Sequence, residues 1–217
     1  MLQVLIDYRF LFFEGFLVTL QLIGYIAVIG IPGGVLLGLF AGRYFQPLAQ
    51  VIKFARFLTK VVPVLVVFFW LHYPFQSFFS VVINPFWTTV FALGVINIVT
   101  IAGITIREIE LLPVSYAEAG KTLGLSRIQI IRHIEAPLLF RRVLPDFLIT
   151  QAAMLEYTLF ASLISVPELF RTAQTINSMI YKPVEIYSLL VIFFTIILTP
   201  LHLTVSWVEK KYNVTYD

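Results

Sequence analysis

The chain has 217 residues, of which 59% are hydrophobic and only 12% are charged, and its mean hydropathy is +0.93. A soluble domain carries about 25% charged residues, so this composition excludes a soluble domain and indicates a lipid environment. The net charge of +3 is spread over separate segments, which argues against nucleic-acid binding, and the absence of cysteine excludes disulfides and thiolate metal sites.

The first fifteen residues predict an interfacial helix rather than a signal peptide. Asp7, Arg9 and Glu14 are scattered among apolar side chains, whereas a signal peptide needs a basic start and an uninterrupted apolar core. Residues 1–15 are therefore expected to form an amphipathic helix at the membrane surface.

Five apolar runs follow, each long enough to cross about 30 Å of hydrocarbon as a helix. The predicted spans are residues 16–41, 61–81, 86–106, 147–166 and 186–207. The second is the least regular, because amphipathic rings and a proline suggest that it reaches an interface at Trp70, His72, Tyr73 and Pro74. No repeat or polar linker divides the chain, so residues 1–217 are expected to form one all-α membrane domain with five transmembrane helices.

The first span contains a cluster of glycines around a proline. Gly30, Pro32, Gly33 and Gly34 lie in its middle, where proline removes a backbone donor and glycine permits a bend or a close helix approach. A packing kink and a moving hinge both fit this pattern, and the packing kink is the preferred interpretation.

The distribution of basic residues predicts the orientation of the spans, because lysine and arginine are retained on the cytoplasmic side. Twelve of the fifteen fall on one side, namely Arg43, Lys53, Arg56, Lys60, Arg107, Lys121, Arg127, Arg132, Arg141, Arg142, Lys210 and Lys211. The other three are Arg9, Arg171 and Lys182. We therefore expect the amino end outside and the carboxyl end inside, with residues 107–146 forming a cytoplasmic loop.

That loop contains two helix-start signals. Ser115 with Glu118 fits the S-x-x-E capping box, and Gly124 fits the left-handed residue that ends a helix. Ser126 with Gln129 forms a second box, whose helix is expected to stop at Pro137. The loop is thus predicted to be a helix, a glycine turn and a second helix.

Part of the same loop imitates a phosphate-binding motif. Gly120, Lys121 and Thr122 match the end of such a motif, but Ser115 stands where its first glycine is required and no strand precedes it. We therefore expect ATP to be bound by another protein and not by this chain.

The spacing of the loop resembles the EAA signature of bacterial ABC importer permeases. The residues that align with the signature are Glu118, Ala119, Gly120, Gly124, Ile134 and Pro137. The chain departs from the usual residues at two aligned positions, with Gly120 in place of an alanine and Ala136 in place of a leucine. The polar amino acid branch of the family is favoured by sequence near residues 19–22, 166–174 and 181–187, and the resemblance covers roughly residues 15 to 212.

The resemblance implies a type I ABC importer permease in the bacterial cytoplasmic (inner) membrane. The matched loop residues would couple the chain to a cytoplasmic ABC ATPase dimer, which would hold ATP and Mg, while this chain would bind no cofactor. A purely structural role for the loop is the competing interpretation; under either one, Ile134 is expected to pack and Pro137 to terminate a helix.

Span four carries polar residues that are candidates for the solute pathway, namely Gln151, Glu156, Tyr157 and Thr158. A carboxylate at membrane depth is costly and should face protein or water, so a structural partner for Glu156 is an equal alternative. Relatives commonly have lysine-aspartate-threonine-serine where Glu156 to Leu159 stand, and a glutamate where Gly103 stands. These departures favour a heterodimer with a second permease subunit over a homodimer.

Residues 167–184 mix apolar and charged side chains and predict a short amphipathic helix at the outer surface. The resemblance makes this helix an external gate that receives a solute-binding protein, and simple attachment to lipid head groups is the alternative. Two other kinds of protein remain open at this point: an ion-gradient-driven secondary transporter or channel, for which Glu156 would be the candidate carboxylate, and a non-transporting scaffold.

Overall fold

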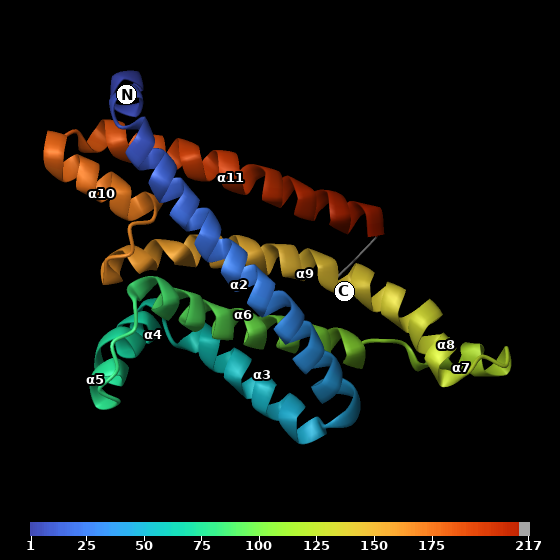
Figure 1. Cartoon of the computed structure of the whole chain (residues 1–217). Coiled ribbons are helices and arrows are strands. Elements are labelled where there is room, and N and C mark those ends of the chain that lie inside the picture. The colour runs from blue at the N-terminus through green and yellow to red at the C-terminus, as the bar shows by residue number, and fades with distance from the viewer. Residues whose placement is uncertain (213–217) are drawn as a thin grey trace.

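The computed structural model describes residues 1–212, and every regular element within them is a helix (Figure 1). Four helices are long and apolar enough to cross a membrane. Three of them are α2 (Arg9–Tyr44), α6 (Pro85–Glu110) and α11 (Pro183–Tyr212). The fourth is a continuous rod made of α8 (Arg127–Ile130), the π-helical turn η2 (Ile131–Glu135), α9 (Ala136–Tyr157) and the 3₁₀ segment η3 (Thr158–Ile164).

The second predicted span, residues 61–81, is shorter in the structure than the sequence suggested. It contains α4 (Val64–Trp70), η1 (Leu71–Phe75) and α5 (Gln76–Phe78), which are long enough to cross a membrane only together with the preceding helix α3 (Gln46–Val61), from which they are bent by 98°. Val62 is extended at the bend and precedes Pro63, which disfavours the helical conformation in the residue before it. Counting this bent pair as one crossing gives five.

The predicted boundary of the first helix at residue 15 is wrong. A short helix, α1 (Leu2–Asp7), ends before Tyr8, and α2 then begins at Arg9. Residues 9–15 belong to α2 because Phe12 is buried there and Gly15 lies against Thr172. The membrane-surface position of the amino-terminal segment stays a prediction, now confined to α1.

Close packing between α2 and α6 depends on a row of glycines. Gly30, Gly34, Gly38 and Gly42 recur every fourth residue of α2 and so share one face. A methyl group added at Gly34 would lie 2.6 Å from Cβ of Ile101 on α6, closer than atoms can approach. These glycines therefore let the two helix backbones approach each other, and α2 continues through Pro32 as one helix, in agreement with the packing interpretation.

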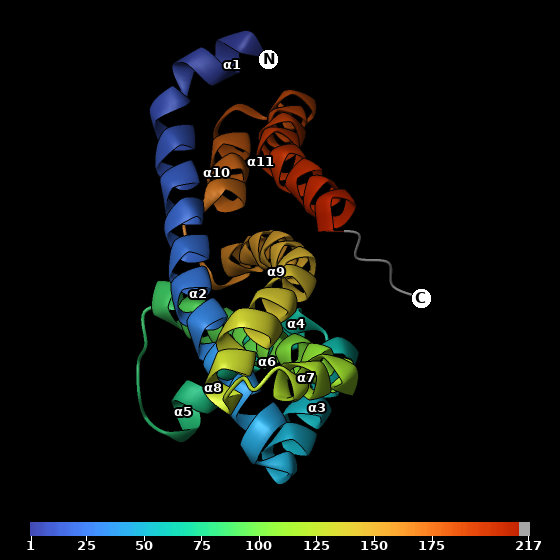
Figure 2. The ribbon, with the colours of Figure 1, turned by 90° about the vertical axis from the view of Figure 1, so that its right-hand side faces the viewer.

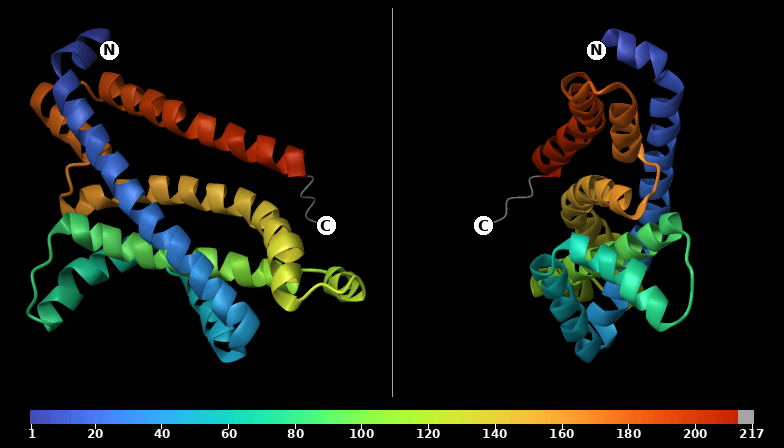
Figure 3. Two further views of the ribbon diagram at one scale, coloured as in Figure 1. Left: turned by 45° about the vertical axis from the view of Figure 1, so that its right-hand side comes forward. Right: turned by 90° about the vertical axis from the view of Figure 1, so that its left-hand side faces the viewer.

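The two ends of the bundle carry different short helices. α8 and the preceding α7 (Val114–Thr122) project beyond the other helices at one end, whereas α1 and α10 (Leu169–Ile180) lie at the opposite end (Figures 1 and 3). The amino terminus is at the α10 end and α11 finishes toward the α7 side, as Figure 1 shows. Seen along the bundle, α10 and α11 lie on one side of α9, and α6 and α3 lie on the other (Figure 2).

The amphipathic helix expected within residues 167–184 is confirmed as α10. Its apolar face is buried by residues of α2 and α11, with Leu169, Ala173 and Ile176 all fully inaccessible. Glu168 caps its start by accepting hydrogen bonds from the backbone amides of Phe170 (2.8 Å) and Arg171 (2.7 Å).

Candidate functional site

The first capping box predicted in the loop is absent. α7 begins two residues earlier than predicted, with Pro113 instead of Ser115 at the N-cap position and no side-chain cap, so Ser115 lies inside the first turn. Proline is restricted to a φ that suits a helix entry and has no amide hydrogen to satisfy, which explains why the helix starts there. Glu118 is therefore free of the capping role assigned to it from the sequence.

The turn and the second capping box are confirmed. Gly124 has a φ of +74°, and the amide of Leu125 donates to the carbonyl of Gly120 as α7 ends. Ser126 and Gln129 then bond reciprocally at the start of α8, with the Ser126 amide donating to Oε1 of Gln129 over 2.8 Å. The Gly120-Lys121-Thr122 sequence forms the last three residues of α7 and does not lie in a loop.

Pro137 does not stop the second helix, contrary to the prediction. The rod continues from α8 into α9, and Pro137 lies in the first turn of α9 directly after the π-helical turn η2. A π turn bonds each amide one residue further back, and this local widening accommodates a residue that has no amide hydrogen and a bulky ring. The movement of α8 is consequently linked to that of the span itself.

Gly120 is the residue at which α7 packs against α8 and η2. It is buried, and a methyl group added there would lie 2.8 Å from Cγ1 of Ile130 and 3.3 Å from Cδ1 of Ile134. Ile134 is thus a packing residue, as expected. The glycine keeps α7 tightly against the start of the rod, and we call residues 111–135 the coupling segment hereafter.

The outward face of the coupling segment is apolar with one acidic side chain. Glu118 and Ala119 are exposed, and Glu118 makes no hydrogen bond or ion pair with any other described residue. Val114, Leu123 and Ile128 are 70%, 78% and 77% exposed. Large apolar side chains at a projecting tip indicate a protein interaction surface.

One ion pair holds the end of the coupling segment, and a charge cluster joins the two helices that flank it. Arg43 at the end of α2 contacts Glu135 of η2 over 2.5 Å. A four-residue charge cluster joins the end of α6 to α9: Arg107 pairs with Glu108 and Asp146 over 2.6 Å each, and Nε of Arg142 donates to Glu108 over 3.1 Å. Glu108 is only 2% exposed, so its charge requires these partners.

This charge cluster was missed from the sequence. Arg107 and Arg142 were counted only as positive-inside signals, although Arg142 and Asp146 are four residues apart and so share a helix face. The sequence did offer a signal for this cluster, since charges of both signs occur at the end of α6 and near the start of α9. Their pairing across 34 to 39 residues depends on how α6 and α9 pack.

The four residues proposed for a solute pathway do not form one site. Gln151 exchanges two 3.2 Å hydrogen bonds with Asn97 of α6, which also donates to the carbonyl of Ile26. Thr158 is buried and donates to the carbonyl of Leu155, while Tyr157 stacks on Phe160. Glu156 is exposed on the surface of the chain. Asn97 therefore links α2, α6 and α9, with Gln151 as its partner on α9, and Glu156 faces outward toward lipid or another chain.

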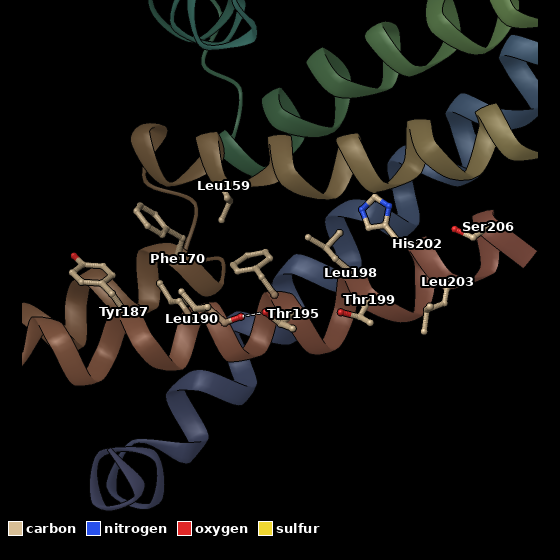
Figure 4. A pocket seen from close by; sticks show the side chains of 12 residues that line it. Leu159, Phe170, Tyr187, Leu190, Thr195, Leu198, Thr199, His202, Leu203 and Ser206 are labelled. Carbon is tan, nitrogen blue, oxygen red and sulfur yellow. Dashed lines mark hydrogen bonds between the residues drawn. The ribbon is translucent and has the colours of Figure 1, made fainter. Parts of the chain in front are cut away.

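A large hollow lies along α11 (Figure 4). It has a volume of about 730 Å³ and is bounded by α11, by Phe170 of α10 and by Leu159 of η3. Its walls are mainly apolar, with the hydroxyl groups of Thr195 and Thr199 in the middle and His202 and Ser206 toward one end. Leu159, which lines this hollow, directly follows Thr158 in the chain, so the hollow borders the segment that carries Glu156, Tyr157 and Thr158.

Comparison with known proteins relates the chain to a family of transport proteins. The family model described as "Binding-protein-dependent transport system inner membrane component" matches residues 34–214. The glutamine transport system permease protein GlnP of Escherichia coli (strain K12) is 31% identical over 212 residues, covering 94% of both chains. The arginine ABC transporter permease protein ArtQ of Haemophilus influenzae is 28% identical over 197 residues, covering 87% of both.

Solved structures share the fold. The crystal structure of an amino acid ABC transporter with histidines matches with a TM-score of 0.84 and 23% sequence identity, over 95% of this chain and 96% of the other. An inward-facing structure of the MetNI methionine ABC transporter matches with a TM-score of 0.63 and 19% identity, over 93% and 98%.

Proposed function

This chain belongs to the family of binding-protein-dependent transport system inner membrane components, and from that premise we propose that it couples ATP hydrolysis in a separate ATPase to the import of an amino acid or a related small polar solute. The chain is a multi-pass permease subunit of the inner membrane and not an enzyme. Relatives of similar length are permeases for glutamine and arginine, which supports the solute class.

The observation that carries the proposal is the exposed Glu118–Ala119 edge on a tip that projects from the bundle. In this proposal the apolar side chains around it enter a groove of a cytoplasmic ABC ATPase dimer, and the Glu118 carboxylate accepts hydrogen bonds from a donor of that partner. ATP and Mg are held by the ATPase subunits. Gly120, Gly124, Ile134 and Pro137 shape the tip rather than contact the ATPase.

The contacts of the coupling segment suggest how motion is transmitted. A displacement of α7 is passed to α8 through Gly120 and Ile130, and to the span because α8 is continuous with α9. The Arg43–Glu135 pair and the charge cluster add connections to α2 and α6. Closure of the ATPase dimer would therefore tilt three spans together and alternate access to the solute.

The remaining partners follow from the same proposal. α10, within residues 167–184, forms the external gate against a solute-binding protein, which sets the amino end outside and the carboxyl end inside. The exposed Glu156 and the half-open hollow along α11 support a second permease subunit at this face. We favour a heterodimer, in which the second subunit supplies solute contacts that Gln151, Tyr157 and Thr158 do not gather here.

Co-expression with candidate ATPases tests the coupling site. Glu118→Lys reverses the charge of an exposed residue without disturbing a cap, so it should abolish ATPase co-purification while membrane insertion stays normal. Asp7→Lys makes the same change on exposed α1 at the opposite end and should leave co-purification intact. Undiminished ATPase capture by Glu118→Lys would disprove the assignment of the docking edge.

A further inference from the structure

A basic hollow lies between α3 and α6, near the end of α6 that leads into the coupling segment. It has a volume of about 400 Å³. Its walls are formed by Lys53, Arg56, Phe57 and Lys60 of α3 and by Gly103, Arg107 and Glu110 of α6. The α3 residues are spaced three and four apart, so they form one face of the helix.

Some of the charges around this hollow already have partners. Lys53 contacts both carboxylate oxygens of Glu110, over 2.7 and 2.8 Å, and Arg107 belongs to the charge cluster with Glu108 and Asp146. Three carboxylates, those of Glu108, Glu110 and Asp146, lie in or beside the hollow. The positive side chains there are five, namely Lys53, Arg56, Lys60, Arg107 and Arg142, so two positive charges are in excess.

Arg56 and Lys60 carry this excess. Neither makes an ion pair within 4 Å with any residue that the structure describes, and Nε of Arg56 is buried without a hydrogen-bond partner among the same residues. Arg56 lies in the fields of both Arg107 and Asp146, of which the first repels it. A buried guanidinium nitrogen with no acceptor is costly, so a ligand that supplies one is stabilised there.

The backbone of α6 holds Arg56 in place. A methyl group added at Gly103 would lie 2.4 Å from Cδ of Arg56, so the arginine stem occupies the space that a side chain at residue 103 would fill. The guanidinium is therefore positioned against α6, and its planar donors suit the paired oxygens of a carboxylate or phosphate.

We propose that the hollow between α3 and α6 binds an oxyanion, either the phosphate of an anionic lipid head group or a small free carboxylate or phosphate. The lipid is the favoured source, because Phe54, Phe57 and Val61 beside the basic face are 62%, 58% and 59% exposed and offer an apolar surface to acyl chains. Basic hollows between helices near a membrane surface bind anionic lipids in this way.

The test measures thermal unfolding of the full chain, purified in neutral detergent with its co-purifying subunits. Phosphatidylglycerol is titrated against zwitterionic phosphatidylcholine, and sodium glutamate and inorganic phosphate are titrated separately. A ligand that binds only the folded state raises the unfolding midpoint as its concentration rises. A specific rise with phosphatidylglycerol identifies lipid phosphate, and a rise with glutamate or phosphate alone identifies a free oxyanion.

Variants show whether an anion-dependent rise in the unfolding midpoint comes from binding in this hollow. Arg56→Gln with Lys60→Gln should weaken the apparent affinity at least about tenfold. Arg127→Gln with Lys210→Gln removes two exposed charges elsewhere and should leave it unchanged. Arg56→Lys with Lys60→Arg keeps the charges and should retain most of the binding, which separates ligand loss from misfolding. No anion-specific rise in the native chain, or equal binding by the Gln variant, would overturn the proposal.

Discussion

Gly120 shows how one residue without a side chain fixes the shape of the coupling segment. Because Ile130 and Ile134 fill the space beside its Cα, Gly120→Leu should force α7 away from α8. Trypsin then cleaves more rapidly at Lys121 and Arg127, which are the basic residues next to the turn. Ala119→Leu introduces the same side chain at an exposed neighbour and should leave the cleavage rate near that of the native chain.

Glu168 makes the attachment of α10 depend on pH. Burial raises the pKa of this carboxyl to about 7, although its hydrogen bonds from the Phe170 and Arg171 amides act in the opposite direction. The folded protein therefore holds the proton more tightly than the unfolded chain, so the contribution of Glu168 to stability is largest at acidic pH and falls between about pH 4.5 and 7.

The corresponding measurement compares unfolding midpoints of the native chain and Glu168→Gln from pH 5 to pH 8. Glutamine stays neutral, so the midpoint of the native chain should fall more steeply with rising pH than that of the variant. Parallel curves would show that Glu168 does not titrate in this range. The outcome depends on the burial of this one cap, which no sequence pattern reveals.

At the level of single residues, the sequence predicts what is local and misses what is brought together by packing. The Ser126–Gln129 box and the left-handed Gly124 were predictable because their partners lie within a few residues. Ser115 was mistaken for a cap because Pro113 begins the helix earlier. The Gln151–Asn97 bonds, across 54 residues, require knowledge of helix packing.

Among the elements, the α2–α6 pair offers the clearest test of packing. Gly34→Ala should lower the unfolding free energy by about 1–3 kcal/mol, because the added methyl group meets Ile101 and the carbonyl of Ile98. Gly24 lies in the same helix with no atom within 4 Å of an added Cβ, so Gly24→Ala should be neutral or slightly stabilising. Equal effects of the two variants on thermal unfolding would contradict close packing at Gly34.

The positions of the elements were predictable wherever an apolar run was long and unbroken. α6 and α11 match their predicted spans to within a few residues. The second span was misjudged because Val62 and Pro63 bend the chain by 98° inside an apolar run, and hydropathy does not detect a change of direction. Pro137 was misjudged because a π turn absorbs its effect within a helix.

For the whole molecule, the main point is that much of the apolar surface of α11 is exposed. The most apolar part of this helix is only 17% buried, compared with 72% for α6, so lipid or a second subunit must surround it. The fold itself was predictable from the EAA spacing together with the apolar spans. The composition of the assembly was not, because contacts between subunits leave no periodic signal in one chain.

Transport in reconstituted membranes measures directly whether the chain depends on an ATPase to move its solute. Proteoliposomes are prepared with the permease, its partner subunits and a solute-binding protein, with ATP enclosed on the ATPase side. We predict that solute uptake requires enclosed ATP and is lost in Glu118→Lys. Uptake that proceeds without ATP and follows a proton or sodium gradient would contradict the account.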